Sequence, residues 1–233
     1  SKVAKDFVGE FDAENIQFRA SSPTSQAVAV LGGSPYSYFR YESHLAAENA
    51  LAVFDEICTE FAQRFGRQYD AVESYRLDDA DYAFFMMGCF ATKAKAAVDS
   101  LREAGWKIGL LQPRLLRPYP AEKIRQALAG KKGVAVIDQN LSMGKGGILH
   151  SELASVLYGH KDAPPVLCSF IGGLGGRDIA SEEFFEIAKS LKQAVDSGAI
   201  PAPRLIYTAD ELRQIRKLQA IAQVERHKLN DQP

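Results

Sequence analysis

The clearest pattern in the chain is an alternation, between about residues 81 and 207, of short apolar runs with longer amphipathic segments. The apolar runs are almost unbroken, as expected for strands that are buried on both faces of a sheet. In the intervening segments apolar residues recur at spacings of three and four, which is typical of helices. The expected strands are 83–87, 108–111, 134–137, 166–171 and a short 205–207, and the expected helices are 91–104, 120–129, 147–158 and 182–195.

This alternation predicts an α/β fold in three layers, with a mostly parallel sheet of about five strands and helices on both faces. Right-handed crossovers between the strands are expected. The sequence shows no internal repeat and no low-complexity tract.

The flanking segments have a different character. Residues 1–42 lack clear periodicity, so we expect an irregular, extended arm, and such a long irregular opening suggests a piece of a larger assembly. A helical pattern runs from Ser43 to Phe65, and Thr208 with Glu211 forms a capping-box pattern at the start of a last helix. The predicted plan is an arm at 1–42, a linker helix and connection at 43–80, the α/β domain at 81–207 and a C-terminal helix at 208–233.

Composition and charge exclude several classes of function. The formal net charge is −1 and no block of Lys and Arg stands out, which argues against a nucleic-acid partner. No apolar run is long enough to cross a bilayer, so no membrane association is expected. The three cysteines, Cys58, Cys89 and Cys168, are far apart, which fits a reducing compartment, and we expect a cytoplasmic protein.

Two glycine-rich loops follow predicted strands and therefore lie at the edge where open α/β sheets meet ligands and partners. Glycines allow close approach of the backbone, and a following helix start can hold an anion. The alternative is that both loops are tight turns without a ligand, and that Arg177 and Asp178 pair with each other or contact another subunit. The candidate interface or anion-contact residues are Gly144, Gly146 and Gly147 in the first loop, and Gly172, Gly173, Gly175, Gly176, Arg177 and Asp178 in the second.

A third candidate loop holds Arg114 and Arg117 between prolines, after another predicted strand. Prolines stiffen the loop, and the planar fork of arginine suits carboxylate or phosphate recognition. An interface contact or an internal ion pair would explain the same residues. No C-x-x-C, phosphate-binding or nucleophile-elbow motif is present, so we predict neither a catalytic residue nor a metal ligand in this chain.

Taken in order, these motifs resemble a known family. The segments that carry the resemblance are Lys107-Ile-Gly-Leu-Leu111, Arg114-Leu-Leu-Arg-Pro-Tyr-Pro120, Val134-Ala-Val-Ile-Asp138, Gly146-Gly-Ile-Leu149 and Ile171-Gly-Gly-Leu-Gly-Gly-Arg-Asp178. Together they resemble the second domain of the α subunit of 2-oxoacid:ferredoxin oxidoreductases, which is similar to the C-terminal domain of transketolase. The likeness covers most of residues 36–190.

The resemblance implies a complex that decarboxylates a 2-oxo acid with thiamine diphosphate and Mg²⁺, passes electrons through iron–sulfur clusters and forms an acyl-CoA. It also implies partners: the N-terminal pyrimidine-binding region of the same subunit, a thiamine-diphosphate-binding β subunit, a γ subunit and a ferredoxin-like δ subunit. The acceptor would be ferredoxin, or NAD through a flavin (FAD) subunit. Pyruvate, 2-oxoglutarate, branched-chain 2-oxo acids and phenylglyoxylate all remain open as substrates.

The chain departs from the whole enzyme, because it lacks a Gly-Asp-Gly diphosphate motif, cluster cysteines and a first domain. We therefore expect it to bind no cofactor alone and to act as a structural part of the subunit, either as a fragment or as a split subunit. The alternatives are a free-standing CoA- or nucleotide-binding α/β enzyme that uses the glycine loops, and an accessory subunit unrelated to oxo acids.

Overall fold

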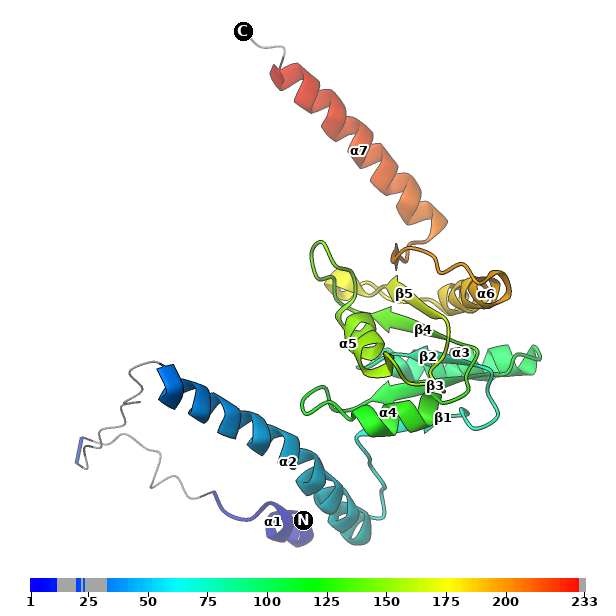
Figure 1. Ribbon diagram of the computed structural model, residues 1–233. Helices are drawn as coiled ribbons and strands as arrows, with labels where there is room; N and C mark the ends of the chain where they lie inside the picture. The colour runs from blue at the N-terminus through cyan, green and yellow to red at the C-terminus, as the bar shows by residue number, and fades with distance from the viewer. Residues whose placement is uncertain (12–19, 22, 24–32, 231–233) are drawn as a thin grey trace. The chain divides into compact units, whose positions relative to one another are not determined.

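The computed structural model describes residues 1–11, 20–21, 23 and 33–230, so part of the predicted arm lies outside the described residues. The chain divides into two units, Ser1–Asp70 and Ala71–Pro233, and each is described by itself (Figure 1). The α/β unit begins at Ala71, ahead of the residue 81 predicted from the sequence.

The first unit holds two helices, α1 (Lys2–Val8) and α2 (Gly33–Phe65). The ring of Phe7 packs edge-on against Phe61 and Phe65, with centroids 5.7 Å from each. Helix α2 starts at Gly33 and not at Ser43. Gly33 and Pro35 disfavour the interior of a helix, so the sequence predicted a later start, but proline is tolerated in the first turn of a helix.

The second unit is built on a sheet of six strands in the order β1-β3-β2-β4-β5-β6. All neighbours pair in parallel except β1, which is antiparallel to β3 at the edge. Strand β1 was not predicted, because its sequence Val-Glu-Ser-Tyr contains no apolar run. The strands are β1 (Val72–Tyr75), β2 (Tyr82–Phe85), β3 (Ile108–Pro113), β4 (Gly133–Asp138), β5 (Leu167–Ile171) and β6 (Arg204–Leu205).

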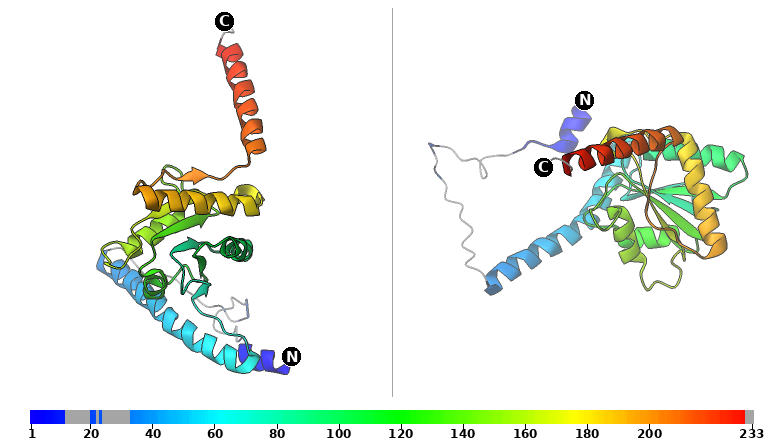
Figure 2. Two further views of the ribbon diagram at one scale, coloured as in Figure 1. Left: turned by 90° about the vertical axis from the view of Figure 1, so that its right-hand side faces the viewer. Right: turned by 90° about the horizontal axis from the view of Figure 1, so that it is seen from above.

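Helices cover both faces of this sheet, so the predicted three-layer α/β fold is confirmed (Figure 2). Helices α3 (Ala91–Glu103) and α6 (Ser181–Ser197) pack on one face around Phe84 and Phe184. Helices α4 (Ala121–Leu128) and α5 (Ile148–Leu157) pack on the other face around Phe85. A short 3-10 turn, η1 (Leu174–Gly176), precedes α6, and α7 (Ala209–Asn230) follows β6.

The crossovers do not all have the same hand. The chain steps from β2 to β3 through α3, and in the opposite direction from β3 to β4 and from β4 to β5 through α4 and α5 on the other face. The step from β5 to β6 continues across the sheet in the same direction as the step from β4 to β5. Its connecting helix α6, however, lies on the face covered by α3 and not on the face covered by α5. The β5-α6-β6 crossover therefore has the opposite hand to the other three. The expectation that all crossovers are right-handed is therefore wrong. Three glycines with positive φ (Gly173, Gly175 and Gly176) bring the chain from the end of β5 onto this face.

Candidate functional site at the carboxyl rim of the sheet

The loops that follow the carboxyl ends of β2, β3, β4 and β5 form one edge of the sheet, which we call the carboxyl rim. Ligands of open α/β sheets bind at this edge, where neighbouring strands lead the chain in opposite directions. In this sheet that switch point lies between β2 and β4, because β2 connects towards β3 and β4 connects towards β5. A ligand of this domain is therefore expected to bind at the rim.

Residues of the domain itself occupy the switch point. A Cβ on Gly88 would lie 3.1 Å from Oε1 of Gln139, and a Cβ on Gly173 would lie 3.2 Å from the ring of Phe90. Both glycines have positive φ. The Nε2 atom of Gln139 is buried and has no hydrogen-bond partner in the described part of the chain. This region is therefore closely packed around one unsatisfied amide group.

The buried carboxylate of Asp138 closes the start of helix α5. Its Oδ1 accepts a hydrogen bond from the backbone N–H of Leu149 at 2.8 Å, and its Oδ2 accepts one from the N–H of His150 at 3.2 Å. The backbone N–H of Ile148, one residue earlier, donates to Oδ1 of Asn140 at 3.1 Å. The amides that could have held an external anion are thus satisfied by internal oxygens.

Gly147 makes this arrangement possible, because a Cβ at that position would lie 1.9 Å from Oδ2 of Asp138. Gly144 and Gly146 have positive φ in the preceding turn, which is held by a bridge between Ser142 and Gly146. Burial raises the pKa of Asp138, and the hydrogen bonds from Leu149 and His150 oppose that shift. The contacts of the first glycine loop favour the interpretation as a turn into a helix.

Arg177 joins the starts of two helices. Its Nη2 donates to Oε1 of Glu183 in α6 at 2.7 Å and to Oε2 of Glu211 in α7 at 2.5 Å. Glu211 also accepts from the backbone N–H of Thr208 at 2.7 Å, and its own N–H donates to Oγ1 of Thr208, which confirms the predicted capping box. The hydrogen bond from Arg177 and then those from Thr208 hold the pKa of Glu211 at about 2.

Asp178 does not pair with Arg177. Its carboxylate accepts from Nζ of Lys93 in α3 and from the backbone N–H of Ile179. The hydrogen bond from Lys93 is the main cause of the lowered pKa of Asp178. The second glycine loop thus connects α3, α6 and α7 through its two charged residues.

Arg114 and Arg117 both form ion pairs within the chain. Arg114 pairs with Glu73 of β1, which also binds Lys95 of α3. Burial acts to raise the pKa of Glu73, but the hydrogen bond and charge of Lys95, with Arg114, outweigh it and lower the pKa. Arg117 pairs with Glu152 of α5 at 2.5 Å, although 62% of its side chain is exposed.

The structure does not gather the candidates into one site. The arginine loop follows β3 and the second glycine loop follows β5, and β2 and β4 lie between these strands. Adjacent strands are about 4.8 Å apart, so the two loops begin roughly 14 Å apart along the rim.

The groups that the family resemblance implies do not fit these residues. Within residues 1–11, 20–21, 23 and 33–230, no three His, Cys, Asp or Glu side chains lie close enough to hold a metal ion. Cys58, Cys89 and Cys168 are free thiols, and the same search of the described residues finds no cluster of cysteines of the kind that holds an iron–sulfur group. No helix among the described residues is long and apolar enough to span a membrane.

Comparison with known proteins decides the family. Residues 80–184 match the model of the pyruvate:ferredoxin oxidoreductase core domain II. Residues 80–184 therefore belong to this domain family. The match runs from the residues before β2 to the first turns of α6, so it includes all three candidate loops of the carboxyl rim.

Relatives of this chain are subunits of oxidoreductases. Pyruvate synthase subunit PorA of Pyrococcus abyssi is 34% identical over 87% of this chain and 51% of its own length. Ketoisovalerate oxidoreductase subunit VorA of the same organism is 39% identical over 71% of this chain and 42% of its own. PorA of Thermotoga maritima is 35% identical over 85% and 50%. The chain thus spans about half the length of the relatives it matches.

Among solved structures, a 2-oxoglutarate:ferredoxin oxidoreductase from Magnetococcus marinus matches 59% of this chain and 23% of its own, at 21% identity and a TM-score of 0.39.

Sequence reasoning missed several residues of the rim and the neighbouring surface. Gln139 directly follows the predicted strand, and its polar side chain at a strand end was a usable signal. Ser169 is a polar residue inside an apolar strand, and its buried hydroxyl has no partner among the residues that the structure describes. Glu183 and Glu211, which bind Arg177, were visible only as helix-capping residues.

Proposed function

We propose that this chain is core domain II of the α-type subunit of a 2-oxoacid:acceptor oxidoreductase, and that its role in the assembly is structural. Thiamine diphosphate, Mg²⁺, the iron–sulfur clusters and CoA would be held by the N-terminal region of the subunit and by β, γ and δ subunits. The acceptor would be ferredoxin, or NAD through a flavin subunit. The assembly would be cytoplasmic, which the three free cysteines support.

The observation that carries the structural role is the internal use of the groups on the carboxyl rim. The helix-start amides of α5 bind Asp138, and the arginines bind carboxylates of neighbouring elements. A domain that held a phosphate or carboxylate ligand at this edge would need such donors free. The alternative of a free-standing CoA- or nucleotide-binding enzyme is not favoured for the same reason.

Parts of the rim remain available to partners. The space around a Cβ at Gly144, Gly175 or Gly176 is open for 4 Å, and most of Arg117 is exposed. We propose that these positions, with the other residues of the two glycine loops and Arg114, face neighbouring chains. The reacting 2-oxo acid would be small, because the relatives are named for pyruvate and for ketoisovalerate at similar identity.

The proposal is tested by purifying the complex through an affinity tag on this chain in its source cells. The expected result is co-purification of subunits that carry iron and thiamine diphosphate, with neither group bound by the chain when it is produced alone. Recovery of the chain as a monomer without such subunits would contradict the proposal, as would stoichiometric thiamine diphosphate on the isolated chain.

A further inference from the structure

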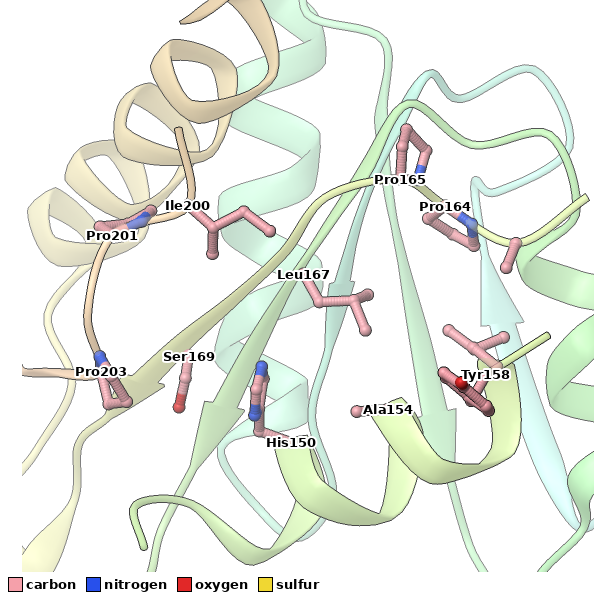
Figure 3. Close-up of a pocket in the computed structure, with 12 residues that line it drawn as sticks. His150, Ala154, Tyr158, Pro164, Pro165, Leu167, Ser169, Ile200, Pro201 and Pro203 are labelled. Carbon is pink, nitrogen blue, oxygen red and sulfur yellow. The ribbon is translucent and has the colours of Figure 1, made fainter. Parts of the chain in front are cut away.

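A pocket of about 480 Å³ lies outside the carboxyl rim, where α5, β5 and the segment 200–203 meet (Figure 3). Most of its lining is apolar and includes Leu157, Tyr158, Leu167 and Ile200. No Asp, Glu, Lys or Arg of the described part of the chain lines it. Of the described residues that line it, His150 is the one whose side chain can carry a positive charge, and a nucleotide or CoA would bring several negative charges into this mostly apolar space, so the lining favours an uncharged occupant.

Ser169 supplies an unsatisfied polar group to this pocket. The residue is only 4% exposed, and its hydroxyl has no hydrogen-bond partner within the described residues. Figure 3 shows its oxygen pointing from β5 into the pocket, between His150 and Pro203. A buried hydroxyl without a partner destabilises the domain, so an occupant that binds it would remove this penalty.

The adjoining edge of β5 also lacks a partner strand. Strand β6 pairs with β5 only at Phe170 and Ile171, and the carbonyl of Ile171 accepts from the N–H of Ile206 at 2.8 Å. The backbone N–H and C=O groups of every second residue point to the same side of a strand. Those of Leu167, four residues before Ile171, therefore face the same edge as the carbonyl of Ile171, and they lie beyond the last described pair of β5 and β6. Such an edge accepts an extended peptide.

Large apolar side chains surround the mouth of the pocket. Tyr158 is 89% exposed and Ile200 is 54% exposed, and exposed aromatic and aliphatic groups beside an uncharged pocket are typical of protein interfaces. The chain spans only about half the length of its relatives, so a protein of that kind has as much polypeptide again to pack against this domain.

We propose that this pocket is a docking site for an extended, uncharged peptide segment of the same oxidoreductase assembly, contributed from outside this chain. The segment places one apolar side chain between α5 and β5, and a backbone carbonyl accepts a hydrogen bond from the hydroxyl of Ser169. This inference rests on the proposed function, because that function supplies the assembly.

The direct test places the photo-crosslinking residue p-benzoylphenylalanine at Tyr158 in the tagged chain, within the complex purified from cells. The expected result is one crosslinked peptide, identified by mass spectrometry, that is apolar, uncharged and absent from these 233 residues. The same substitution at Ser155, which lies on α5 but does not line the pocket, should give no such product. A small molecule retained in the pocket, or no peptide crosslink at Tyr158, would overturn the inference.

Two variants add an independent readout. Ala154→Trp fills the pocket and should reduce recovery of the assembled complex at least tenfold, whereas Ser155→Trp on the next residue should leave it unchanged.

Ser169→Val should raise the melting temperature of the isolated chain by about 2–4 °C and should also weaken assembly of the complex. A serine with only a structural role would not produce both effects. Normal assembly of Ala154→Trp overturns this inference alone, but failure of the unmodified chain to assemble overturns the proposed function as well.

Discussion

Asp138 and Gly147 fit together so closely that a Cβ on the glycine would lie 1.9 Å from Oδ2 of the carboxylate. The strand β4 ends at Asp138, and helix α5 begins just after Gly147. The carboxylate can therefore reach the first amides of the helix only if residue 147 has no side chain. This contact explains why two of the segments that carry the family resemblance have an aspartate at the end of β4 and a glycine just before α5.

This relationship predicts that Gly147→Ala is strongly destabilising. The new methyl group would displace the Asp138 side chain and break its bonds to Leu149 and His150, which should cost roughly 3 kcal/mol. Chemical denaturation of the α/β unit measures this loss. An Asp138→Ala background removes the two shortest contacts of the new methyl group and leaves only the one at 2.9 Å with the Cβ of residue 138, so Gly147→Ala should there cost at least about 1 kcal/mol less. Equal costs in both backgrounds would show that the two residues are not coupled.

Arg177 should control the first turn of α7. Arg177→Met leaves Glu183 and Glu211 without their shared cation, so the amides of residues 208–212 should exchange hydrogen at least tenfold faster. Hydrogen–deuterium exchange measures this effect. Arg213→Met is the matched control, because Arg213 pairs with the exposed Asp210 in the same helix and its loss should leave exchange unchanged. Unaltered exchange in Arg177→Met would contradict the anchoring role.

The same contact predicts a response to acid. The pKa of Glu211 is lowered to about 2 in the folded protein, whereas a free glutamate titrates at about 4.3. Because the folded pKa is the lower one, the contribution of Glu211 to stability is complete above about pH 5 and is lost as the pH falls towards 2. Carboxyl NMR shifts of Glu211 should give a midpoint near pH 2, and a midpoint near 4.3 would exclude the pair with Arg177.

The two arginines of the third candidate loop should differ. Arg117 is 62% exposed and its pair with Glu152 is screened by solvent, so Arg117→Ala should change stability by less than about 0.5 kcal/mol. Arg114 pairs with the less exposed Glu73, which would be left with Lys95 alone, so Arg114→Ala should cost about 1 kcal/mol. Denaturation of both variants compares them, and a larger loss for Arg117→Ala would reverse this assignment.

Much of the fold could be predicted from the sequence, because the buried strands of a parallel sheet are apolar on both faces. The segment 83–87 was predicted as a strand, and β2 spans Tyr82–Phe85, all buried. The edge strand β1 could not be predicted in this way, since only one side of an edge strand needs to be apolar and Glu73 instead binds cations. The hand of the last crossover depends on which face α6 covers, and local periodicity does not encode that choice.

The candidate site was predictable in position but not in partners. The loops that hold the candidate glycines and arginines lie at the carboxyl rim, because sequence order places them directly after strand ends. The pairing of Arg177 with Glu211, 34 residues away along the chain, is a tertiary contact that spacing does not reveal. Likewise, Ser169 is conspicuous in an apolar strand, but only the structure shows that its hydroxyl lacks a partner.

The most direct test of the structural role measures reduction of a viologen dye that depends on both a 2-oxo acid and CoA. The chain alone and the tagged complex that contains it should be compared, with pyruvate and 3-methyl-2-oxobutanoate as substrates. We predict activity in the complex with at least one of these acids, and none with the chain alone at any concentration. Turnover by the isolated chain, or a fully active complex from cells that lack the chain, would contradict the account.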